Sequence, residues 1–252
     1  MKKNHQKEIE ELQLANKKLS EENVALKQQN KELQQFSYLA SHDLQQPVNN
    51  IISYLSILED SRKNLDDMGN LCLTVIKKSS YKMKKFITSL LDYAVIGTHK
   101  KDELIDINRV LKSVKEVLLE KLQETNSTLH INIEKHQFYS YKNDIHLLFL
   151  HLIENALNFK KENEAPVIKI NSVIQNHDYL YSISDNGIGI ENVHFEKIFD
   201  IFYTINRDET YEGVGIGLAY CKKIIELYGG KIWIKATLNQ GTTVFFTLPK
   251  ST

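Results

Sequence analysis

The sequence is poor in residues that break regular structure or cross-link a chain. Only three prolines and ten glycines occur among its 252 residues, and eight of the glycines lie after residue 186. The two cysteines, Cys72 and Cys221, form neither a metal-ligand pattern nor a disulfide framework, so we expect a reduced, intracellular compartment. Lysine plus arginine equals aspartate plus glutamate, at 32 each, which leaves no net charge to attract nucleic acid.

The sequence also lacks a long hydrophobic run. Its richest apolar stretch, residues 147–153, is interrupted by His151 and is far too short to span a bilayer. The charged first ten residues lead into no apolar segment, so we predict no signal peptide. Because 42% of the residues are hydrophobic, the chain can bury a core. We therefore expect a cytoplasmic globular chain with no membrane segment.

Residues 1–35 are predicted to form a parallel coiled coil. Leucine recurs every seven residues, at Leu12, Leu19, Leu26 and Leu33. The other seam position holds Ile9 and then asparagine in three heptads, at Asn16, Asn23 and Asn30. A buried asparagine pairs best with its symmetry mate, which favours two parallel strands. A single solvated helix is the alternative, but it would have no reason to keep the leucine register.

Two long helices that follow are predicted to form an antiparallel hairpin. The helical pattern runs from Phe36 to Glu59, a polar break covers Asp60–Asp67, and a second helix extends from about Met68 to Val95. One hairpin cannot bury both of its apolar faces, whereas two copies can form a four-helix bundle in a homodimer. We assign residues 36–96 to this domain and residues 97–103 to a linker.

From residue 104 to residue 252, helical and strand patterns alternate. This alternation predicts an α+β sandwich, a mixed sheet with helices on one face. Helices are expected at Asn108–Gln123, Asn143–Lys161 and Val214–Tyr228. Strands are expected at Val167–Ile174 and Tyr179–Ser184, and in a closing hairpin at Lys231–Thr237 and Thr243–Leu248.

His42, in the segment SHDLQQP, is the first candidate for catalysis. At 100° per residue it lies about 200° from Leu44, away from the apolar stripe of its helix. Asp43 can accept a hydrogen bond from one ring nitrogen, which makes the other nitrogen a better nucleophile. Gln46 lies one turn on and can hold a water, and Pro47 removes a backbone donor. A solvated surface histidine is the alternative interpretation.

Two motifs in the second half carry further polar residues. Asn155 and Asn158, in HLIENALNFK, are three residues apart and share one face of a helix. Asp185 begins DNGIGI directly after a predicted strand, and Gly187 and Gly189 would let the backbone pass close to a ligand. Each motif taken alone could be an ordinary polar face or an ordinary turn.

A third motif, EGVGIGL, places glycines at alternate positions before a helix and ends at Leu218. Gly213, Gly215 and Gly217 would free backbone amides to bind phosphate at the start of that helix. The motif lacks the preceding strand of a dinucleotide-binding fold and the Lys-Ser/Thr pair of a P-loop. On its own it is therefore weak evidence for a nucleotide site.

Together, and in this order, the motifs resemble the core of sensor histidine kinases. SHDLQQP is similar to the phytochrome-like form of the phosphoacceptor motif, and the later motifs resemble the ATP-binding domain of the gyrase, chaperone and histidine kinase superfamily. The resemblance covers residues from about Phe36 to Leu248. It implies that His42 is the phosphoacceptor, that Asp43 is its general base, and that Gln46 positions water for dephosphorylating the partner.

The resemblance also implies a site for ATP and Mg²⁺ in the C-terminal domain. Asn155 would bind the magnesium ion, and Asp185 would accept a hydrogen bond from the adenine amino group. The other implied ATP-binding residues are Asn158, Gly187, Gly189, Arg207, Gly213, Gly215, Gly217 and Leu218. His151, Asn158 and Thr204 stand where the family usually has Asn, Lys and often Arg, so the phosphates have fewer cations near them.

The function implied by the resemblance is ATP-dependent autophosphorylation of His42 in a homodimer. The phosphoryl group would then pass to an aspartate in the receiver domain of a response regulator, with no role for nucleic acid. Two alternatives remain open. One is an ATPase that uses nucleotide as a conformational clamp, and the other is a dimeric scaffold without phosphotransfer.

Overall fold

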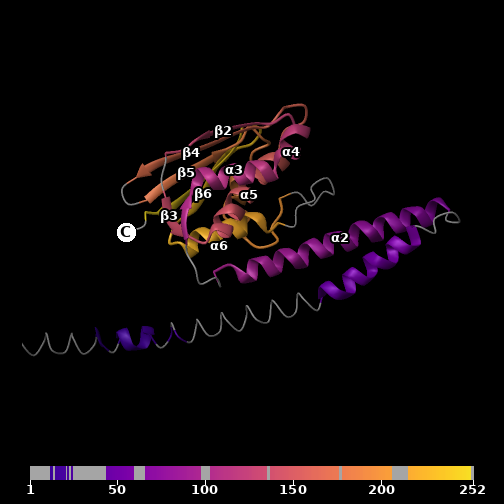
Figure 1. Cartoon of the computed structure of the whole chain (residues 1–252), viewed down its shortest axis with the longest axis horizontal. Coiled ribbons are helices and arrows are strands. Elements are labelled where there is room, and N and C mark those ends of the chain that lie inside the picture. The colour runs from indigo at the N-terminus through magenta and orange to yellow at the C-terminus, as the bar shows by residue number, and fades with distance from the viewer. Residues whose placement is uncertain are drawn as a thin grey trace, which may run out of the picture. The chain divides into compact units, whose positions relative to one another are not determined.

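The computed structural model describes ten segments of the chain, which fall into two compact units, Met1–Val95 and Ile96–Thr252 (Figure 1). The described residues are 12–13, 15–20, 22, 24, 44–59, 66–97, 103–134, 137–175, 178–205 and 215–250. Within these residues, no helix combines the length and the apolar character needed to cross a membrane.

The first unit contains an antiparallel helical hairpin, as the sequence predicts. Its helices are residues 44–59 and α2 (Asp67–Val95). Near one end, Gln45 Nε2 donates a hydrogen bond to Thr88 Oγ1 at 3.3 Å. Near the other end, Lys77 Nζ lies 2.6 Å from Glu59 Oε2. Because an early residue of one helix meets a late residue of the other, the two helices run in opposite directions.

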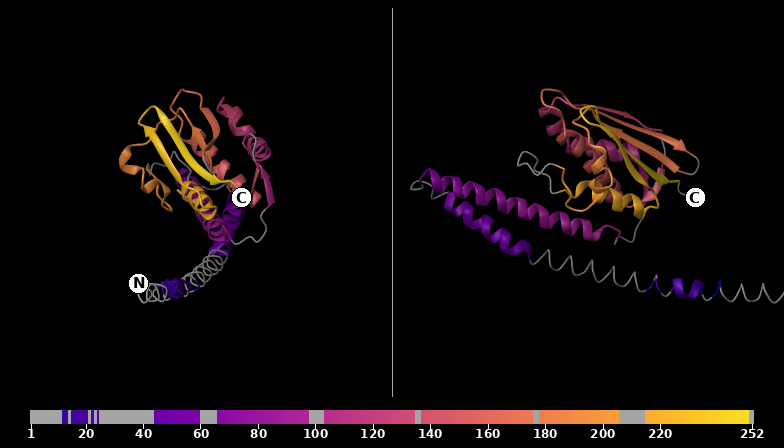
Figure 2. Two further views of the ribbon diagram at one scale, coloured as in Figure 1. Left: turned by 90° about the vertical axis from the view of Figure 1, so that its left-hand side faces the viewer. Right: turned by 180° about the vertical axis from the view of Figure 1, so that it is seen from behind.

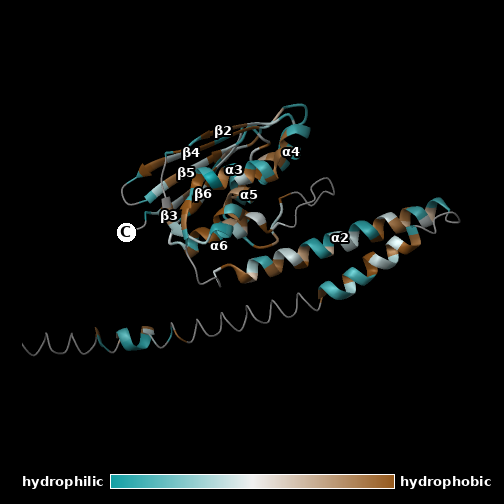
Figure 3. Cartoon of the chain, in the orientation of Figure 1, coloured by the Kyte–Doolittle hydropathy of each residue, from teal (hydrophilic) through white to brown (hydrophobic). Residues whose placement is uncertain are grey.

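Each helix of the hairpin carries two apolar stripes. One stripe is buried, with members seven residues apart: Val48 and Leu55 on one helix, and Leu73, Ser80, Ile87 and Ala94 on α2. The other stripe is exposed with the same spacing, at Leu44, Ile51 and Leu58, and at Ile76 and Met83. Figure 3 shows hydrophobic and hydrophilic stretches alternating along α2. A single hairpin therefore leaves a large part of its apolar surface exposed.

The described part of the predicted coiled coil is helical. It comprises residues 12–13, 15–20, 22 and 24, in which Leu12 and Leu19 are 63% and 57% exposed. Leu26, Leu33 and two of the three seam asparagines lie outside the described residues. The coiled coil and its parallel pairing therefore stay predictions.

The second unit is a two-layer sandwich with helices on one face of a mixed sheet, as predicted (Figures 1 and 2). The strand order is β2-β4-β5-β7-β6, with β2 parallel to β4 and the other neighbours antiparallel. These strands are β2 (Thr128–Asn132), β4 (Val167–Gln175), β5 (Asp178–Ser184), β6 (Ile232–Thr237) and β7 (Gly241–Pro249). The last pair is the predicted closing hairpin.

The helices of this unit precede and follow the central strands in the chain. They are α3 (Ile107–Val117), α4 (Leu119–Glu124), α5 (Lys142–Asn158) and α6 (Gly217–Leu227), with single 3₁₀ turns η2 (Asn192–His194) and η3 (Lys197–Phe199). A separate two-stranded sheet pairs β1 (Glu103–Asp106) with β3 (Gln137–Ser140).

The core lies between the sheet and α5. Alternate strand residues point at the helices and are almost fully buried: Ile168, Ile170, Tyr181, Ile183, Phe246 and Leu248. Phe149 of α5 packs edge-on against Tyr181 and Phe246, which stack on each other with ring centroids 4.8 Å apart. These aromatic contacts fix α5 on the sheet, and so they fix the position of Asn155.

The structure corrects several predicted helices. Residues Asn108–Gln123 form two helices, because buried Leu118 leaves the helical conformation at φ −90° and ψ 5°. Helix α5 ends at Asn158, before Lys161, and α6 begins at Gly217, after Val214. Gly215 cannot start that helix because its φ is +73°.

Three strands were not predicted. Strand β1 begins at Glu103, inside the expected linker, and β3 is only four residues long. In β2 only Leu129 is half-buried and the other four residues are exposed. Strands β1 and β3 have four residues each and show no alternation of apolar and polar residues, whereas TLHIN in β2 does alternate, so its signal was present in the sequence and was missed.

Candidate functional site

Some of the predicted site residues lie outside the described residues. They are His42, Asp43, Arg207 and Gly213. Gln46 is described and lies exposed on the helical hairpin, next to Gln45, which bonds to Thr88. Helical structure continues through Pro47. The face that carries Gln46 is therefore open to water.

Asp185 follows directly on β5, and the backbone of two segments holds its carboxylate. Oδ1 accepts hydrogen bonds from the backbone N–H of Gly187 at 2.8 Å and of Thr242 at 3.1 Å. The backbone N–H of Asp185 donates to the Thr242 carbonyl at 2.8 Å. Burial raises the pKa of this carboxyl, and the two N–H donors partly offset that rise. No described residue donates to Oδ2, so one oxygen anchors Asp185 and the other can receive a ligand's donor.

Close backbone contacts around Asp185 require glycine. A Cβ on Gly187 would clash with the carbonyl oxygen of Phe159. Gly189 has φ +70°, and a Cβ there would clash with the carbonyl oxygen of Thr237. A Cβ on Gly241 would meet the carbonyl oxygen of Asp185 itself. These glycines therefore keep the backbone around Asp185 in place, in addition to any room they leave for a ligand.

Gly217 begins α6 opposite the last turns of α5. A Cβ on Gly217 would lie 3.8 Å from both terminal atoms of the Asn155 amide and 3.7 Å from His151 Nδ1. The His151 ring is tilted against Tyr220, with centroids 5.1 Å apart. Asn155 and Gly217 are half-buried, as is Leu218 beside them. An amide oxygen and the amino end of a helix thus share one site, and these groups suit Mg²⁺ and phosphate respectively.

The two flanks of residues 206–214 are tied together. The backbone N–H of Phe202 donates to the Gly215 carbonyl at 2.8 Å. A Cβ on Gly215 would lie 2.8 Å from the carbonyl oxygen of Tyr203, so the approach is as close as glycine allows. The Tyr203 hydroxyl and His194 Nδ1 are 2.7 Å apart. The described residues on either side of residues 206–214 are therefore held together and fixed to the fold.

Sequence reasoning missed three contributions to this site. Thr242 holds Asp185 from another strand, and the Phe159 carbonyl accepts a hydrogen bond from the Ile188 N–H at 3.0 Å. Lys121 Nζ donates to Asn158 Oδ1 at 2.6 Å. Nothing in the local sequence could reveal these contacts, because each joins residues far apart in the chain.

Asn186 is a further residue whose contribution sequence reasoning missed. It follows Asp185 in DNGIGI, and its side chain closes the turn before β4. Its Oδ1 accepts from the Val167 N–H at 2.8 Å, while its Nδ2 donates to Glu164 Oε1 at 2.8 Å. These bonds join residues 19 to 22 positions apart, so they too arise from the fold and not from the local sequence.

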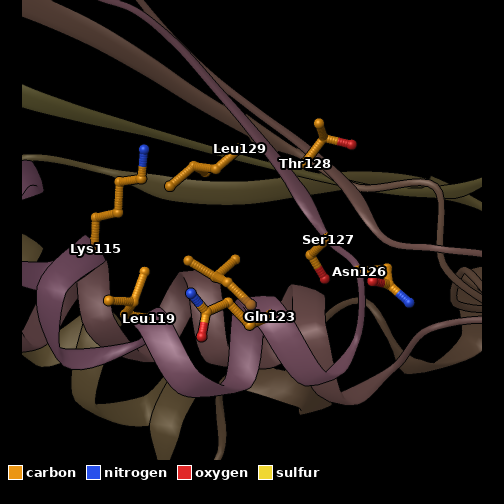
Figure 4. Close-up of a pocket in the computed structure, with 8 residues that line it drawn as sticks. Lys115, Leu119, Gln123, Asn126, Ser127, Thr128 and Leu129 are labelled. Atoms are coloured by element: carbon orange, nitrogen blue, oxygen red, sulfur yellow. The ribbon is translucent and has the colours of Figure 1, made fainter.

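A groove of about 600 Å³ lies between α4 and β2 and is separate from these residues (Figure 4). Its lining consists of Lys115, Leu119, Leu122, Gln123, Asn126, Ser127, Thr128 and Leu129. None of the predicted site residues belongs to it. The candidate site is therefore the region of Asp185, Asn155 and Gly217, which side-chain and backbone contacts define.

Comparison with known proteins identifies both halves of the chain. The His Kinase A (phospho-acceptor) domain matches residues 32–98, and the histidine kinase-, DNA gyrase B- and HSP90-like ATPase matches residues 141–252. The chain is 34% identical over 227 residues to cyanobacterial phytochrome A of Nostoc sp. strain PCC 7120, a match that covers 89% of this chain and 29% of that protein. The chain spans about 30% of the length of the curated relatives it matches.

Two solved structures of histidine kinase ThkA are also similar. Its catalytic domain is 28% identical with a TM-score of 0.53, and the match covers 60% of this chain and 97% of that one. ThkA in complex with the response regulator protein TrrA is 22% identical with a TM-score of 0.61, covering 88% of this chain and 64% of that one. At 22% identity, the likeness to the complex structure shows only that the fold is shared.

Proposed function

Because the chain is a histidine kinase core, with a phosphoacceptor domain before the family's ATPase domain, we propose that it phosphorylates itself on His42 from ATP. The phosphoryl group then passes to an aspartate of a response regulator, the kind of partner with which ThkA was crystallised. The observation that carries the proposal is Asp185. Its Oδ1 is anchored by two backbone N–H groups, while its Oδ2 receives no hydrogen bond from the described residues.

The proposed nucleotide site runs from Asp185 to the start of α6. Asp185 Oδ2 accepts a hydrogen bond from the adenine amino group. Asn155 provides an oxygen ligand for Mg²⁺, and the amino end of α6 at Gly217 holds phosphate oxygens. The described residues contain no cluster of three His, Cys, Asp or Glu side chains that could hold a metal ion. Magnesium commonly uses few protein ligands and takes the rest from phosphates and water, so Asn155 fits that role.

The reaction transfers one phosphoryl group to a ring nitrogen. Asp43 holds the proton of one His42 nitrogen, so the lone pair of the other nitrogen attacks the γ-phosphorus in line. An N–P bond forms, the bond from phosphorus to the β–γ bridging oxygen breaks, and ADP leaves. Gln46 is exposed, and it can position the water that removes the phosphoryl group from the response regulator. Since ATP and a response regulator are its substrates, the kinase acts in the cytoplasm.

Incubation of the chain with γ-labelled ATP and magnesium tests the proposal. We expect protein-bound label that is lost in acid and kept in alkali, as a phosphohistidine requires. A nucleotide-clamped ATPase would instead release labelled phosphate and leave the protein unlabelled. A scaffold without phosphotransfer would do neither. Label that survives acid would indicate phosphorylation of a hydroxyl group and would contradict the proposal.

Replacing Gly217 with alanine is expected to lower ATP affinity by about ten-fold without harming the fold. Among the described residues, the atom nearest to the new methyl group is His151 Nδ1 at 3.7 Å, and alanine is the better helix former. The methyl would, however, occupy the space beside Asn155 in which we place phosphate. Calorimetric titration and thermal unfolding measure the two effects.

Gly229→Ala is the matched control for this variant. Gly229 follows α6 with φ +75° and has open space around it, so alanine strains the backbone alone. We expect it to destabilise the fold by about 1–2 kcal/mol and to leave ATP affinity unchanged. If Gly217→Ala binds ATP as the wild type does, the phosphates do not lie at the start of α6.

We further propose that the kinase is a homodimer joined through the exposed stripe of the helical hairpin. This stripe contains Leu44, Ile51 and Leu58 on one helix and Ile76 and Met83 on the other, all exposed in the single chain. Their seven-residue spacing equals that of the buried stripe, so a second hairpin can pack there in the same manner. The coiled coil of residues 1–35 would add a parallel pairing in front of residues 36–96, and the ATPase domain would follow the linker at residues 97–103.

A chain lacking residues 1–34 is expected to remain a folded dimer, because the hairpin stripe is sufficient for pairing. In the same truncated chain, Ile51→Glu should give a monomer, since it would bury two unpaired carboxylates in each dimer. Ile174→Glu places the same charge at an exposed position on β4 and should leave the dimer intact. Light scattering distinguishes these outcomes. A monomeric truncated chain would show that the hairpin cannot dimerise without the coiled coil.

A further inference from the structure

Lys121 reaches from α4 to the last turn of α5. Its Nζ donates a hydrogen bond to Asn158 Oδ1 at 2.6 Å, and both side chains are at the surface. Leu119 and Gln123 of α4 line the groove beside β2 (Figure 4). Each is two residues from Lys121, which places Lys121 about 160° away from both around the helix axis. Lys121 therefore extends away from these two residues, and its ammonium reaches Asn158 at the end of α5.

Asn158 lies at the edge of the proposed nucleotide site. It is three residues after Asn155, so the two amides share one face of α5. The amide of Asn155 faces Gly217 at the start of α6, where we place phosphate. The residue after Asn158 is Phe159, whose carbonyl oxygen contacts the backbone beside Asp185. Asn158 therefore shares a helix face with the proposed Mg²⁺ ligand and directly precedes the residue that contacts the backbone beside Asp185.

The resemblance implies that the family's usual lysine is missing at Asn158, and the structure brings another lysine to that position. Lys161, a nearby cation in the chain, is held by Glu164, with Nζ and Oε2 3.1 Å apart. Lys121 is instead held by the neutral amide of Asn158, which does not cancel its charge. A lysine ammonium on a flexible stem can exchange an amide oxygen for a phosphate oxygen, which bears more charge and binds it more strongly.

We propose that Lys121 binds the phosphates of ATP and supplies, from α4, the positive charge that Asn158 does not provide. This inference rests on the proposed ATP site. Asn158 holds the Lys121 ammonium near its working position before the nucleotide arrives. Magnesium neutralises only part of the charge on the triphosphate, so a further cation lowers the energy of the bound nucleotide and of the charge that moves during transfer.

Calorimetric titration of Lys121→Gln with ATP, ADP and adenosine tests the inference, with magnesium present throughout. We expect ATP to bind about ten-fold more weakly, because a hydrogen bond to a charged group is lost. Adenosine has no phosphate, so its affinity should match that of the wild type. The matched control is Lys115→Gln, which removes the same charge from a lysine that lines the groove on the other side. It should bind all three ligands normally.

A relocated charge makes the test sharper. The double variant Lys121→Gln with Asn158→Lys should regain most of the lost ATP affinity, since the ammonium returns to the same edge of the site. Equal weakening of ATP and adenosine in Lys121→Gln would show a structural role and overturn the proposal, as would unchanged ATP binding. Thermal unfolding of each variant identifies any loss of fold.

Failure of this inference is distinguishable from failure of the proposed function. Autophosphorylation of the wild type is measured with the same preparations. If the wild type becomes phosphorylated while Lys121→Gln binds ATP normally, only the role of Lys121 is wrong. If the wild type binds ATP without becoming phosphorylated, and Lys121→Gln still weakens ATP selectively, only the kinase proposal is wrong.

Discussion

Replacing His42 with glutamine should reduce the acid-labile label on the chain to below about one per cent of the wild-type level. Glutamine is polar and of similar reach, but it has no nitrogen lone pair that can attack the γ-phosphorus. ATP affinity should not change, because the nucleotide site that we propose, at Asp185, Asn155 and Gly217, lies in the other unit. Labelling with γ-labelled ATP and calorimetric titration measure the two quantities separately.

His130→Gln serves as the control for this substitution. His130 lies exposed on β2, outside every predicted site, so its replacement should leave the labelling at the wild-type level. The chain contains nine histidines. If His42→Gln kept its label, one of the other eight would be the acceptor, and the role we give to the hairpin would be wrong.

Replacing Asp185 with asparagine is expected to weaken ATP binding by about 100-fold. Asparagine keeps the oxygen that accepts from Gly187 and Thr242, so the backbone around the site stays in place. Its amide nitrogen then stands where Oδ2 was, and this donor faces the donor of the adenine amino group. ATP affinity falls because the charged acceptor is missing and because the N–H donors of asparagine and adenine face each other. Calorimetric titration measures this loss of affinity.

The same substitution should not destabilise the chain without nucleotide. Burial raises the pKa of Asp185 in the folded state, so between its ordinary value and the raised value the folded chain binds more protons than the unfolded chain. The contribution of Asp185 to folding stability therefore decreases as pH rises through that window. At neutral pH the buried carboxylate is charged, and this charge destabilises the fold. Asparagine carries no charge, so thermal unfolding at neutral pH should occur at the same or a higher temperature.

Asp178→Asn, at the first residue of the same strand, is the control for Asp185→Asn and should bind ATP normally. Two results would count against the assignment of Asp185. Wild-type ATP affinity in Asp185→Asn would remove its role in binding adenine. An equal loss of ATP affinity and of folding stability would show that Asp185 only maintains the fold.

The parts of the fold that were predicted from sequence are those with strong local patterns. Strands β4 and β5 alternate apolar and polar residues, and α2 keeps an apolar face over 29 residues. Strand β2, TLHIN, alternates in the same way but was not predicted; it is short and lies at the edge of the sheet with most of its residues exposed. The break between α3 and α4 occurs at Leu118, with neither proline nor glycine to announce it.

The residues of the candidate site also fall into two groups, those with a local sequence signal and those without one. Asp185 and Gly189 stand out in the sequence because a carboxylate at a strand end, followed by glycines, is a short local signal. The partners of Asp185 and Asn158 do not stand out, because Thr242 and Lys121 meet them only through the folded sheet and helices. Sequence reasoning therefore found the groups that carry a local motif and missed those that reach the site from distant parts of the chain, Lys121 among them.

The most direct test of the kinase proposal is to locate the phosphoryl group on the chain after incubation with ATP and magnesium. Trypsin should release the peptide Glu32–Arg62, in which His42 is the only histidine. Mass spectrometry under alkaline conditions should find the mass of one phosphoryl group on this peptide, with fragment ions that place it on His42. The phosphoryl group on any other peptide, or an unmodified peptide in a preparation that binds ATP, would contradict the transfer of phosphate from the ATPase domain to His42.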